Sequence, residues 1–467
     1  MIRTEETICA PATAVGGAIS IIRVSGPQSF TICEKLFIPL DKTIKLIDQK
    51  GFTIIFGNIQ SGDEIIDEVL LSVFRAPRSY TGENAVEISC HASPYIVRRI
   101  MELLIKNGAT AANPGEFTQR AFLNGQIDLS QAEAVADIIA STTRSAHSIA
   151  MNQMRGGFSK EISRLRSELL NFASLIELEL DFGEEDVEFA DRSKLTSIIL
   201  SVKDIADKLI GSFSLGNAIK NGIPVVIVGK PNSGKSTLLN ALLMEDKAIV
   251  SEIPGTTRDV IEDTIVIDGI EYRFIDTAGL RETTDVIETM GIRKTHEKIN
   301  QASIILLVDE ISDSFEAINK RIGVIREMIR GLDKHVLILI NKTDQALPEK
   351  QEELRQMISV EEKETLLFIS AKKNTGLDVL RLKLSEAVLK DKLKSDDVII
   401  TNIRHYEVML HVSESLERVI SGLDNNIPDD FIAIDIRQAI HYLGEITGEI
   451  TSDEILGNIF KNFCIGK

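Results

Sequence analysis

The sequence predicts a protein of mixed α/β and α class, in which an α/β unit lies between two helical segments and a second α/β unit precedes them. Short apolar runs separated by loops and helices, in residues 1–120 and again in residues 218–385, predict the two α/β units. Apolar residues that recur every three or four positions predict the helical segments. A chain of 467 residues also suits about three domains.

Residues 1–120 have the pattern of an α/β unit. Turn residues such as Ser25, Gly26 and Pro27 separate its apolar runs. The expected strands cover residues 18–24, 51–59, 68–73 and 85–90, and the expected helix covers residues 94–106.

From about residue 121 the apolar spacing becomes helical. One stripe consists of Ile162, Leu165, Leu169, Phe172 and Ile176, and similar stripes beyond residue 386 consist of Met409, Val412, Leu416 and Val419, and of Ile436, Ile440 and Leu443. Between them, buried and mostly parallel strands are expected at residues 225–228, 270–275, 304–308, 336–340 and 366–369. The simplest interpretation is one helical domain, residues 121–217 and 386–467, interrupted by an inserted domain at residues 218–385. Two independent helical bundles stay open as an alternative.

Composition limits the classes of function. A net charge of −18 argues against a broad basic surface for nucleic acid, so any RNA must be held by a partner or by a small local patch. The four cysteines have no metal-ligand spacing, which suits a reducing compartment. The apolar stretch at residues 8–24 is interrupted by Pro11 and two glycines and lacks a basic flank. We therefore expect a cytoplasmic protein that does not span a membrane.

Residues 229–236 read GKPNSGKS, which fits the pattern GxxxxGK followed by Ser or Thr. The motif stands between an apolar run, residues 225–228, and a helix-like segment, residues 237–243. In such a P-loop, backbone N–H groups converge on phosphate oxygens, Lys235 neutralises the β and γ oxygens, and the Ser236 hydroxyl reaches Mg²⁺. The motif predicts a nucleotide site.

Two further motifs follow in the order that such a site requires. Residues 276–279 read DTAG after the expected strand, so that Asp276 can hold Mg²⁺ through water and Gly279 can donate its N–H to the γ-phosphate. Residues 255–259 read GTTRD between this motif and the P-loop. We expect Thr257 to complete the Mg²⁺ shell.

The last two motifs predict which base is bound. Residues 341–344 read NKTD and residues 370–372 read SAK, each after an expected strand. The Asp344 carboxylate can accept hydrogen bonds from the ring N–H and the exocyclic amine of guanine, whereas adenine offers no such donor pair. The five motifs together predict a Ras-like P-loop GTPase domain.

The position that carries a water-orienting glutamine in many GTPases holds Leu280, which cannot align water. Arg258 and Arg281 lie nearby, but neither is an obvious arginine finger. The acidic residues Glu282, Asp285 and Glu288 are candidates for orienting the water, and a solvated charged loop is the alternative interpretation.

These motifs resemble the MnmE (TrmE) family of bacterial and organellar tRNA-modification GTPases. The resemblance rests on Asn232 in the P-loop, on residues 255–259 and 276–280, and on the chain end CIGK. N-terminal segments also match: RSYTGE at residues 78–83 and PGEFTQRAFLNG at residues 114–125. The resemblance therefore spans the whole chain.

The resemblance implies a homodimer formed through the N-terminal domains, with G domains that pair during turnover. It implies a K⁺ ion held by Asn232, Ser251, Ile253 and Thr256, which offsets charge in the transition state, although turn propensity alone could explain Asn232. Glu288 matches the residue that positions the water, and Lys235 is the other catalytic residue of the G domain. The implied GTP-binding residues are Asn232, Ser233, Gly234, Lys235, Ser236, Thr237, Ser251, Glu252, Ile253, Pro254, Gly255, Thr256, Thr257, Asp276, Thr277, Ala278, Gly279, Asn341, Lys342, Asp344, Ser370, Ala371 and Lys372. Ser236 and Thr257 are the implied Mg²⁺ ligands.

The resemblance also implies a chemistry at the N-terminal domain. The family transfers a one-carbon unit from 5,10-methylene- or 5-formyl-tetrahydrofolate to the 5 position of the wobble uridine of certain tRNAs, with the FAD-dependent partner MnmG (GidA). Arg23, Glu87 and Lys467 match the positions expected to bind folate. Gln126 stands where many relatives carry a basic residue, so an ion pair with folate is lost there. Cys464 is a candidate reactive thiol, with a small buried side chain as the alternative.

Two other functions stay open. A regulatory or ribosome-assembly GTPase would use its flanking domains only to bind partners, and would not bind folate. A folate-dependent one-carbon transferase with a degenerate G domain is a further alternative, against which the five intact motifs argue.

Overall fold

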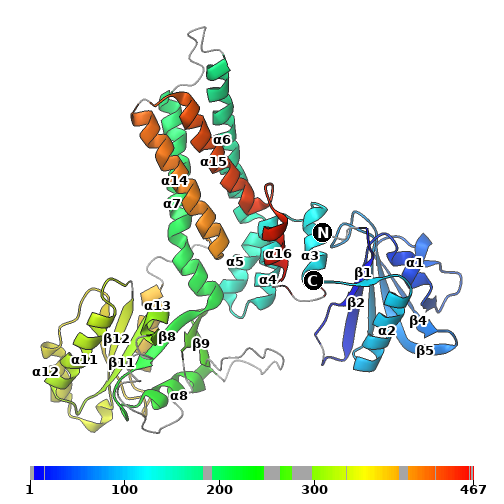
Figure 1. Ribbon diagram of the computed structural model, residues 1–467. Coiled ribbons are helices and arrows are strands. Elements are labelled where there is room, and N and C mark those ends of the chain that lie inside the picture. The colour runs from blue at the N-terminus through cyan, green and yellow to red at the C-terminus, as the bar shows by residue number, and fades with distance from the viewer. Residues whose placement is uncertain are drawn as a thin grey trace. The chain divides into compact units, whose positions relative to one another are not determined.

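The computed structural model (Figure 1) describes residues 5–14, 16–181, 192–246, 263–275, 297–332, 334–388, 398–425, 427–461, 463 and 466. The chain divides into two compact units. Unit 1 comprises Met1–Ile139, Met151–Ala206 and Val408–Lys467, and unit 2 comprises Ala140–Ala150 and Asp207–Glu407. None of the helices in the described part of the chain is long and apolar enough to span a membrane.

Unit 1 begins with a seven-stranded sheet in the order β3-β4-β5-β6-β2-β1-β7. Its strands are β1 (Ile8–Pro11), β2 (Ile19–Ser25), β3 (Phe37–Pro39), β4 (Thr53–Ser61), β5 (Glu64–Phe74), β6 (Ala85–His91) and β7 (Thr110–Ala111). Neighbouring strands are antiparallel, except that β1 and β7 are parallel. The strands expected from the apolar runs are confirmed as β2, β4, β5 and β6, and the helix expected at residues 94–106 is α2.

The two faces of this sheet are covered differently. Three short elements, α1 (Ser29–Glu34), η1 (Leu46–Asp48) and α2 (Pro94–Lys106), pack their apolar side chains on one face and form the larger core. On the other face, Phe117 of α3 (Glu116–Leu123) packs against Ile8 and Ala10 of β1. The alternation of side chains along each strand produces these two layers.

The rest of unit 1 is helical. The helices are α4 (Leu129–Ala140), α6 (Gly157–Asp181), α7 (Arg192–Asn221), α14 (Ile403–Asp424), α15 (Asp429–Thr447) and α16 (Asp453–Lys461), of which α7 and α14 extend into unit 2. The predicted stripe from Ile162 to Ile176 is buried along α6, which packs against α15. Lys203 of α7 pairs with Glu417 of α14 at 3.1 Å. Segments from both sides of the insertion therefore form one helical domain. The predicted fold class, mixed α/β and α with an inserted α/β domain, is confirmed.

The end of the chain returns to α3. Phe460 of α16 packs in a small apolar cluster with Leu129 and Leu456. Gly115, which precedes α3, has φ 69°, and a Cβ there would lie 2.7 Å from the carbonyl oxygen of Phe460. A side chain at position 115 would thus be strained and would push α16 away.

Unit 2 contains a six-stranded sheet in the order β13-β12-β11-β8-β10-β9. Its strands are β8 (Ile223–Val228), β9 (Asp263–Ile267), β10 (Ile270–Phe274), β11 (Ile304–Glu310), β12 (His335–Asn341) and β13 (Glu364–Phe368). All neighbours are parallel except β9, which pairs antiparallel with β10 at the edge. The five strands expected here are confirmed, and β9 is an addition.

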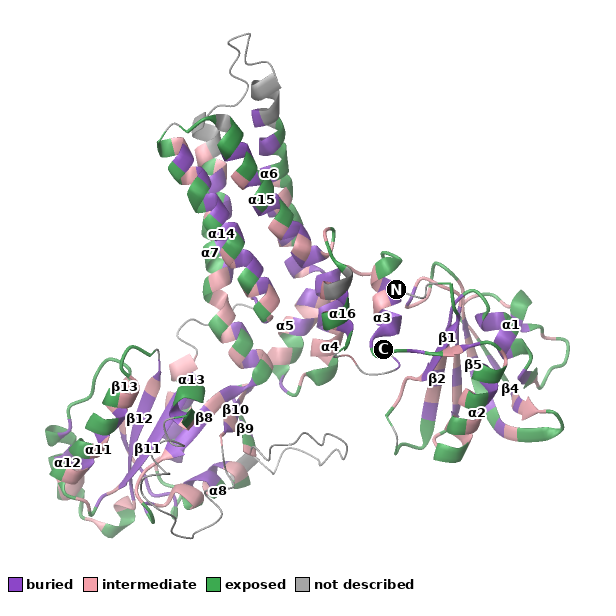
Figure 2. Cartoon of the chain, viewed as in Figure 1, coloured by how far each residue is buried: buried purple, intermediate pink, exposed green. Residues whose placement is uncertain are grey.

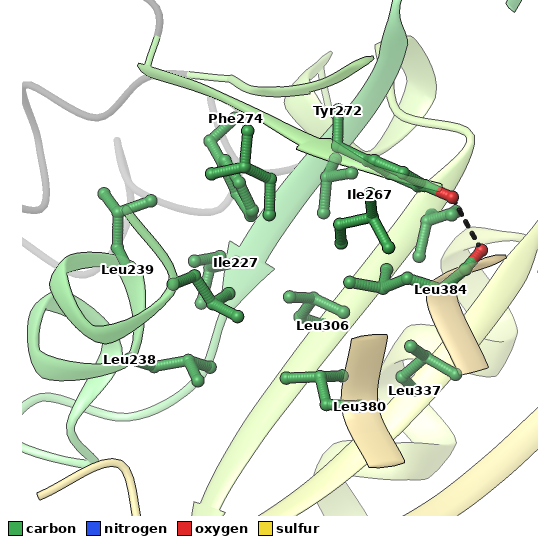
Figure 3. Packing of buried hydrophobic residues seen from close by; sticks show 14 of the residues in the cluster. Ile227, Leu238, Leu239, Ile267, Tyr272, Phe274, Leu306, Leu337, Leu380 and Leu384 are labelled. Atoms are coloured by element: carbon green, nitrogen blue, oxygen red, sulfur yellow. Dashed lines mark hydrogen bonds between the residues drawn. The ribbon is translucent and has the colours of Figure 1, made fainter. Parts of the chain in front are cut away.

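Helices cover both faces of this sheet, and its strands are largely buried (Figure 2). Apolar residues of α8 (Lys235–Asp246) and α13 (Leu377–Val388) pack on one face, and those of α11 (Phe315–Met328) and α12 (Pro348–Met357) pack on the other. Ala146 and Ile149 of α5 (Arg144–Met154) add to the first layer. Leu238, Leu306 and Leu380 meet in this layer, and the Tyr272 hydroxyl donates to the Leu384 carbonyl at 3.0 Å (Figure 3).

Tyr272→Phe is expected to lower the free energy of unfolding by about 0.5–1.5 kcal/mol, because it removes the buried hydrogen bond to the Leu384 carbonyl. Chemical denaturation of the full chain measures this change. Tyr95→Phe, at a half-exposed position of α2, is the control and is expected to leave the stability unchanged. Equal stabilities of the Tyr272→Phe variant and the wild type would contradict the assigned hydrogen bond.

Candidate functional site

The loop after β8 makes a tight turn into α8. Gly229 and Gly234 have φ values of 148° and 96°. A Cβ at Gly229 would lie 2.2 Å from the Val308 carbonyl oxygen, and a Cβ at Gly234 would lie 2.3 Å from Nδ2 of Asn341. Asn232, between them, is also left-handed at φ 63°, a conformation that Asn tolerates better than most residues. Glycine at positions 229 and 234 therefore lets this loop pack closely against the end of β11 and the side chain of Asn341.

Lys235 begins α8 and lies over this loop. Its Nζ donates to the carbonyl oxygens of Gly229 at 2.9 Å and Lys230 at 2.7 Å, and burial lowers its pKa. The positive end of the α8 dipole adds to this charge. Ser236 and Thr237 follow in the first turn. The turn is built to receive anionic oxygens.

Asn341, the last residue of β12, connects three loops. Its Nδ2 donates to the Ser233 carbonyl oxygen at 2.9 Å, and its Oδ1 accepts from the Ala371 backbone N–H at 3.0 Å. Asn341 and Ser233 are both buried. The structure therefore brings the P-loop, the NKTD segment and the SAK segment together.

Asp344 lies in η2 (Thr343–Gln345), at the surface of this cluster. Its Oδ1 accepts from the Ser370 hydroxyl at 2.6 Å. This hydrogen bond, with a contribution from the nearby charge of Lys372, lowers the pKa of the Asp344 carboxyl. The group is thus an ionised acceptor at neutral pH.

A group of ion pairs that the sequence analysis did not identify lies beside the P-loop. Lys230 Nζ pairs with Glu310 at 3.1 Å and with Asp313 at 2.6 Å, and Glu310 also accepts from Lys342. Arg321 pairs with Asp313. The hydrogen bond from Lys342 lowers the pKa of Glu310, and the hydrogen bond to Asp313 raises the pKa of Lys230. The only sequence signal was an acidic pair at the end of an apolar run, which is equally typical of a solvated loop.

Asp309 belongs to the same group and is fully buried. Arg321 Nε donates to its Oδ1 at 2.5 Å, and burial raises the pKa of the Asp309 carboxyl. This ion pair attaches α11 to the end of β11.

Several predicted site residues belong to segments that the structure does not describe. The following lie outside the described residues: Ser251, Glu252, Ile253, Pro254, Gly255, Thr256, Thr257, Asp276, Thr277, Ala278, Gly279, Glu288, Cys464 and Lys467. β9 begins after the first of these segments and β10 ends before the second.

In unit 1, the structure brings Arg23 and Glu87 together. They face each other across β2 and β6, and the guanidinium pairs with the carboxylate at 2.8 Å. The guanidinium carbon lies 5.2 Å from the centre of the Tyr80 ring and 5.5 Å from that of Phe117. Arg23 Nη1 also donates to the Gly466 carbonyl oxygen at 3.4 Å, so the chain end passes this pair.

Gln126 lies on the loop that follows α3, and its side chain is exposed. Its backbone N–H bonds the Ala121 carbonyl at 2.9 Å. A Cβ at Gly82 would lie 3.1 Å from Gln126 Nε2, so the side chain rests against that turn.

Comparison with known proteins covers the whole chain. A family model described as the N-terminus of the GTP-binding protein TrmE matches residues 7–126, and one described as the MnmE helical domain matches residues 129–464. A tRNA modification GTPase MnmE of Bacteroides thetaiotaomicron is 53% identical over 467 residues, covering 99% of this chain and 100% of the relative. Its counterpart in Christiangramia forsetii is 52% identical over 476 residues and covers 100% of both chains.

Among solved structures, the G domain of the T. maritima FeoB iron transporter is 25% identical, with a TM-score of 0.26, and covers 35% of this chain and 98% of that chain. The family models and the two full-length relatives decide the assignment, because their matches run from the N-terminal sheet to the last helix. The chain belongs to the MnmE (TrmE) family of tRNA modification GTPases.

Proposed function

We propose that this chain binds GTP at the unit 2 site and hydrolyses it. The observation that carries the proposal is the connection of Asp344 and Ser370 to the P-loop through Asn341. An ionised carboxylate at that place can accept both donors of guanine, and a base without them would leave it unpaired. Lys235 and the start of α8 supply positive charge for the phosphates.

We also assign Mg²⁺ to this site, with Ser236 and Thr257 as ligands and Asp276 acting through water. Ser236 follows Lys235, the proposed phosphate-binding lysine, in the first turn of α8. Its hydroxyl is therefore a candidate ligand for a metal beside the phosphates. Glycine at positions 229 and 234 lets the loop that carries Lys235 and Ser236 pack against the Val308 carbonyl and the Asn341 amide. The metal supplies charge that neutralises the β and γ oxygens.

For hydrolysis, we assign Glu288 to positioning the water and Asn232, Ser251, Ile253 and Thr256 to binding K⁺. The exposed Asn232 side chain extends from a left-handed residue of the P-loop, which supports its availability as a ligand. A bound K⁺ supplies positive charge beside the transferred phosphate, where the sequence offers no obvious arginine finger. Lys235 holds the phosphate chain in place.

In the tRNA reaction, we propose that the chain acts with the FAD-dependent partner MnmG on the 5 position of the wobble uridine, using a tetrahydrofolate one-carbon unit. The full-length similarity to MnmE relatives supports this assignment. The Arg23 guanidinium, near the Tyr80 and Phe117 rings and beside Glu87, supports an anionic ligand with a flat ring system. Lys467 and Gln126 are further candidates for folate contacts, and no chemical step is assigned to Cys464.

The N-terminal sheet also supports a homodimer. An exposed apolar patch lies on strands β3, β4 and β5 and on Leu40, the residue after β3. Its five side chains are each at least 42% exposed: Ile38, Leu40, Ile54, Phe56 and Leu70. Phe56 and Leu70 are opposite each other in the β4–β5 register, so the patch is continuous. An apolar face of this kind is expected to be covered in the working protein. We propose that a second copy of the chain covers it, and that tRNA is held largely through MnmG in view of the net charge of −18.

Asp344→Asn is expected to weaken GTP binding on the order of 10⁴-fold, because a carboxamide cannot accept from both guanine donors. The variant is expected to gain affinity for XTP, since xanthine has a carbonyl where guanine has its amino group. Equilibrium binding of both nucleotides measures the switch. Asp268→Asn is the matched control, because this turn residue is left-handed at φ 52° and Asn tolerates that conformation. Unchanged GTP binding in the Asp344 variant would refute the base assignment.

Asn232→Gly tests the K⁺ assignment without disturbing the turn, because Gly also adopts the left-handed backbone. Its GTP hydrolysis in K⁺ is expected to fall to the rate measured in Na⁺, with GDP binding nearly unchanged. Asn232→Asp keeps an oxygen ligand and is expected to retain part of the K⁺ stimulation. If the glycine variant still distinguishes K⁺ from Na⁺, Asn232 serves the turn alone.

Cells that lack this protein are expected to lose the carboxymethylaminomethyl or aminomethyl group from wobble uridines, as measured by mass spectrometry of tRNA nucleosides. The wild-type gene should restore the modification. Lys235→Ala should not, because GTP turnover requires that lysine. Full modification in the deletion strain would favour the regulatory or ribosome-assembly GTPase instead.

A further inference from the structure

Glu310 contacts two of the loops of the nucleotide site with one carboxylate. Its Oε1 accepts from Nζ of Lys342, in the base-reading segment, and its Oε2 accepts from Nζ of Lys230, in the P-loop, at 3.1 Å. The Ser312 hydroxyl also donates to Oε2, at 3.2 Å. The Glu310 side chain is 13% exposed, so water competes only weakly for these contacts.

The backbone of Glu310 belongs to the sheet, whereas Lys230 and Lys342 lie in loops. Glu310 ends β11, which pairs with β8 on one side and β12 on the other. It is opposite Asn341, and the Ile311 N–H bonds the Asn341 carbonyl at 3.0 Å. Lys342 follows Asn341 directly and has a left-handed backbone, with φ 64°. The end of β11 is therefore a fixed point to which two loop lysines are attached.

We propose that Glu310 is a positioning residue that holds the base-reading segment and the P-loop in register, and so slows the release of guanine nucleotide. The proposal rests on GTP binding at this site. Glu310 does not touch the nucleotide in this role. It acts through Lys342 and Lys230.

Removing the Glu310 carboxylate should have opposite effects on nucleotide binding, depending on whether it acts through its charge or by positioning the two lysines. A carboxylate beside the P-loop repels phosphate, so its removal would tighten nucleotide binding if only its charge mattered. If it positions the two lysines, its removal loosens both loops and weakens binding. The sign of the change therefore separates the two roles.

Glu310→Gln preserves the size of the side chain and removes its charge. We expect GDP to dissociate roughly tenfold faster from the full-length variant, followed with a fluorescent GDP analogue, since two charge-assisted hydrogen bonds are weakened. The KM for GTP should rise by a similar factor with kcat unchanged. Glu364→Gln is the matched control: it breaks a buried ion pair with Arg326 in the same domain, at 2.6 Å, without touching either loop, and should leave GDP dissociation unchanged.

A second comparison tests the route through the lysines. In a variant that already carries Lys230→Met and Lys342→Met, adding Glu310→Gln should not accelerate GDP dissociation further. Unchanged or slower GDP release from the Glu310 variant, equal acceleration in the Glu364 variant, or a full further effect in the lysine-free background would each overturn the proposal. If the wild-type chain does not bind GTP at all, the proposed function fails and this inference fails with it.

Discussion

The candidate nucleotide site depends on two hydrogen bonds made by the carboxamide of Asn341. This carboxamide donates to the Ser233 carbonyl and accepts from the Ala371 N–H, so one side chain joins the loops after β8, β12 and β13. Only a group with both a donor and an acceptor can do this, and a carboxylate would oppose the Ser233 carbonyl. The same amide explains why position 234 must be glycine, since a Cβ there would lie 2.3 Å from Nδ2.

The parallel sheet makes this junction possible. The carboxyl ends of parallel strands meet at one edge, so residues far apart in the sequence become neighbours. The order β13-β12-β11-β8 puts the loops that carry Ser370, Asn341 and Ser233 at this edge. β11 lies between β12 and β8, which is why Glu310 at its end can contact a lysine from each side.

Sequence patterns predicted the helices, strands and motifs that depend on local residue spacing. They failed mainly for contacts between residues that are far apart in the sequence. The helix at residues 94–106 and the buried strands of unit 2 have strong apolar periods and were found. β7 is too short to show a period. β9 was missed although it forms a local hairpin with β10 through Asp268 and Gly269, a turn that the sequence does signal. The P-loop and base motifs have fixed spacing and could be located. Glu310 could not, because its two lysines come from distant segments, and the Arg23–Glu87 contact depends on a strand register spanning 64 residues.

The inserted domain requires its two ends to lie together, and the described residues meet this requirement. Phe213 of α7 stacks on Tyr406 of α14 with ring centres 4.4 Å apart, and the Ile400 N–H donates to the Ser212 hydroxyl at 3.1 Å. A Cβ at Gly216 would lie 2.1 Å from the Ile400 carbonyl oxygen, so the two segments touch backbone to backbone. These contacts hold the two ends of the inserted segment together. The chain therefore enters and leaves unit 2 at neighbouring points, as an inserted domain requires. Only Gly222 separates α7 from β8, so the strand that leads into the P-loop follows this helix almost directly.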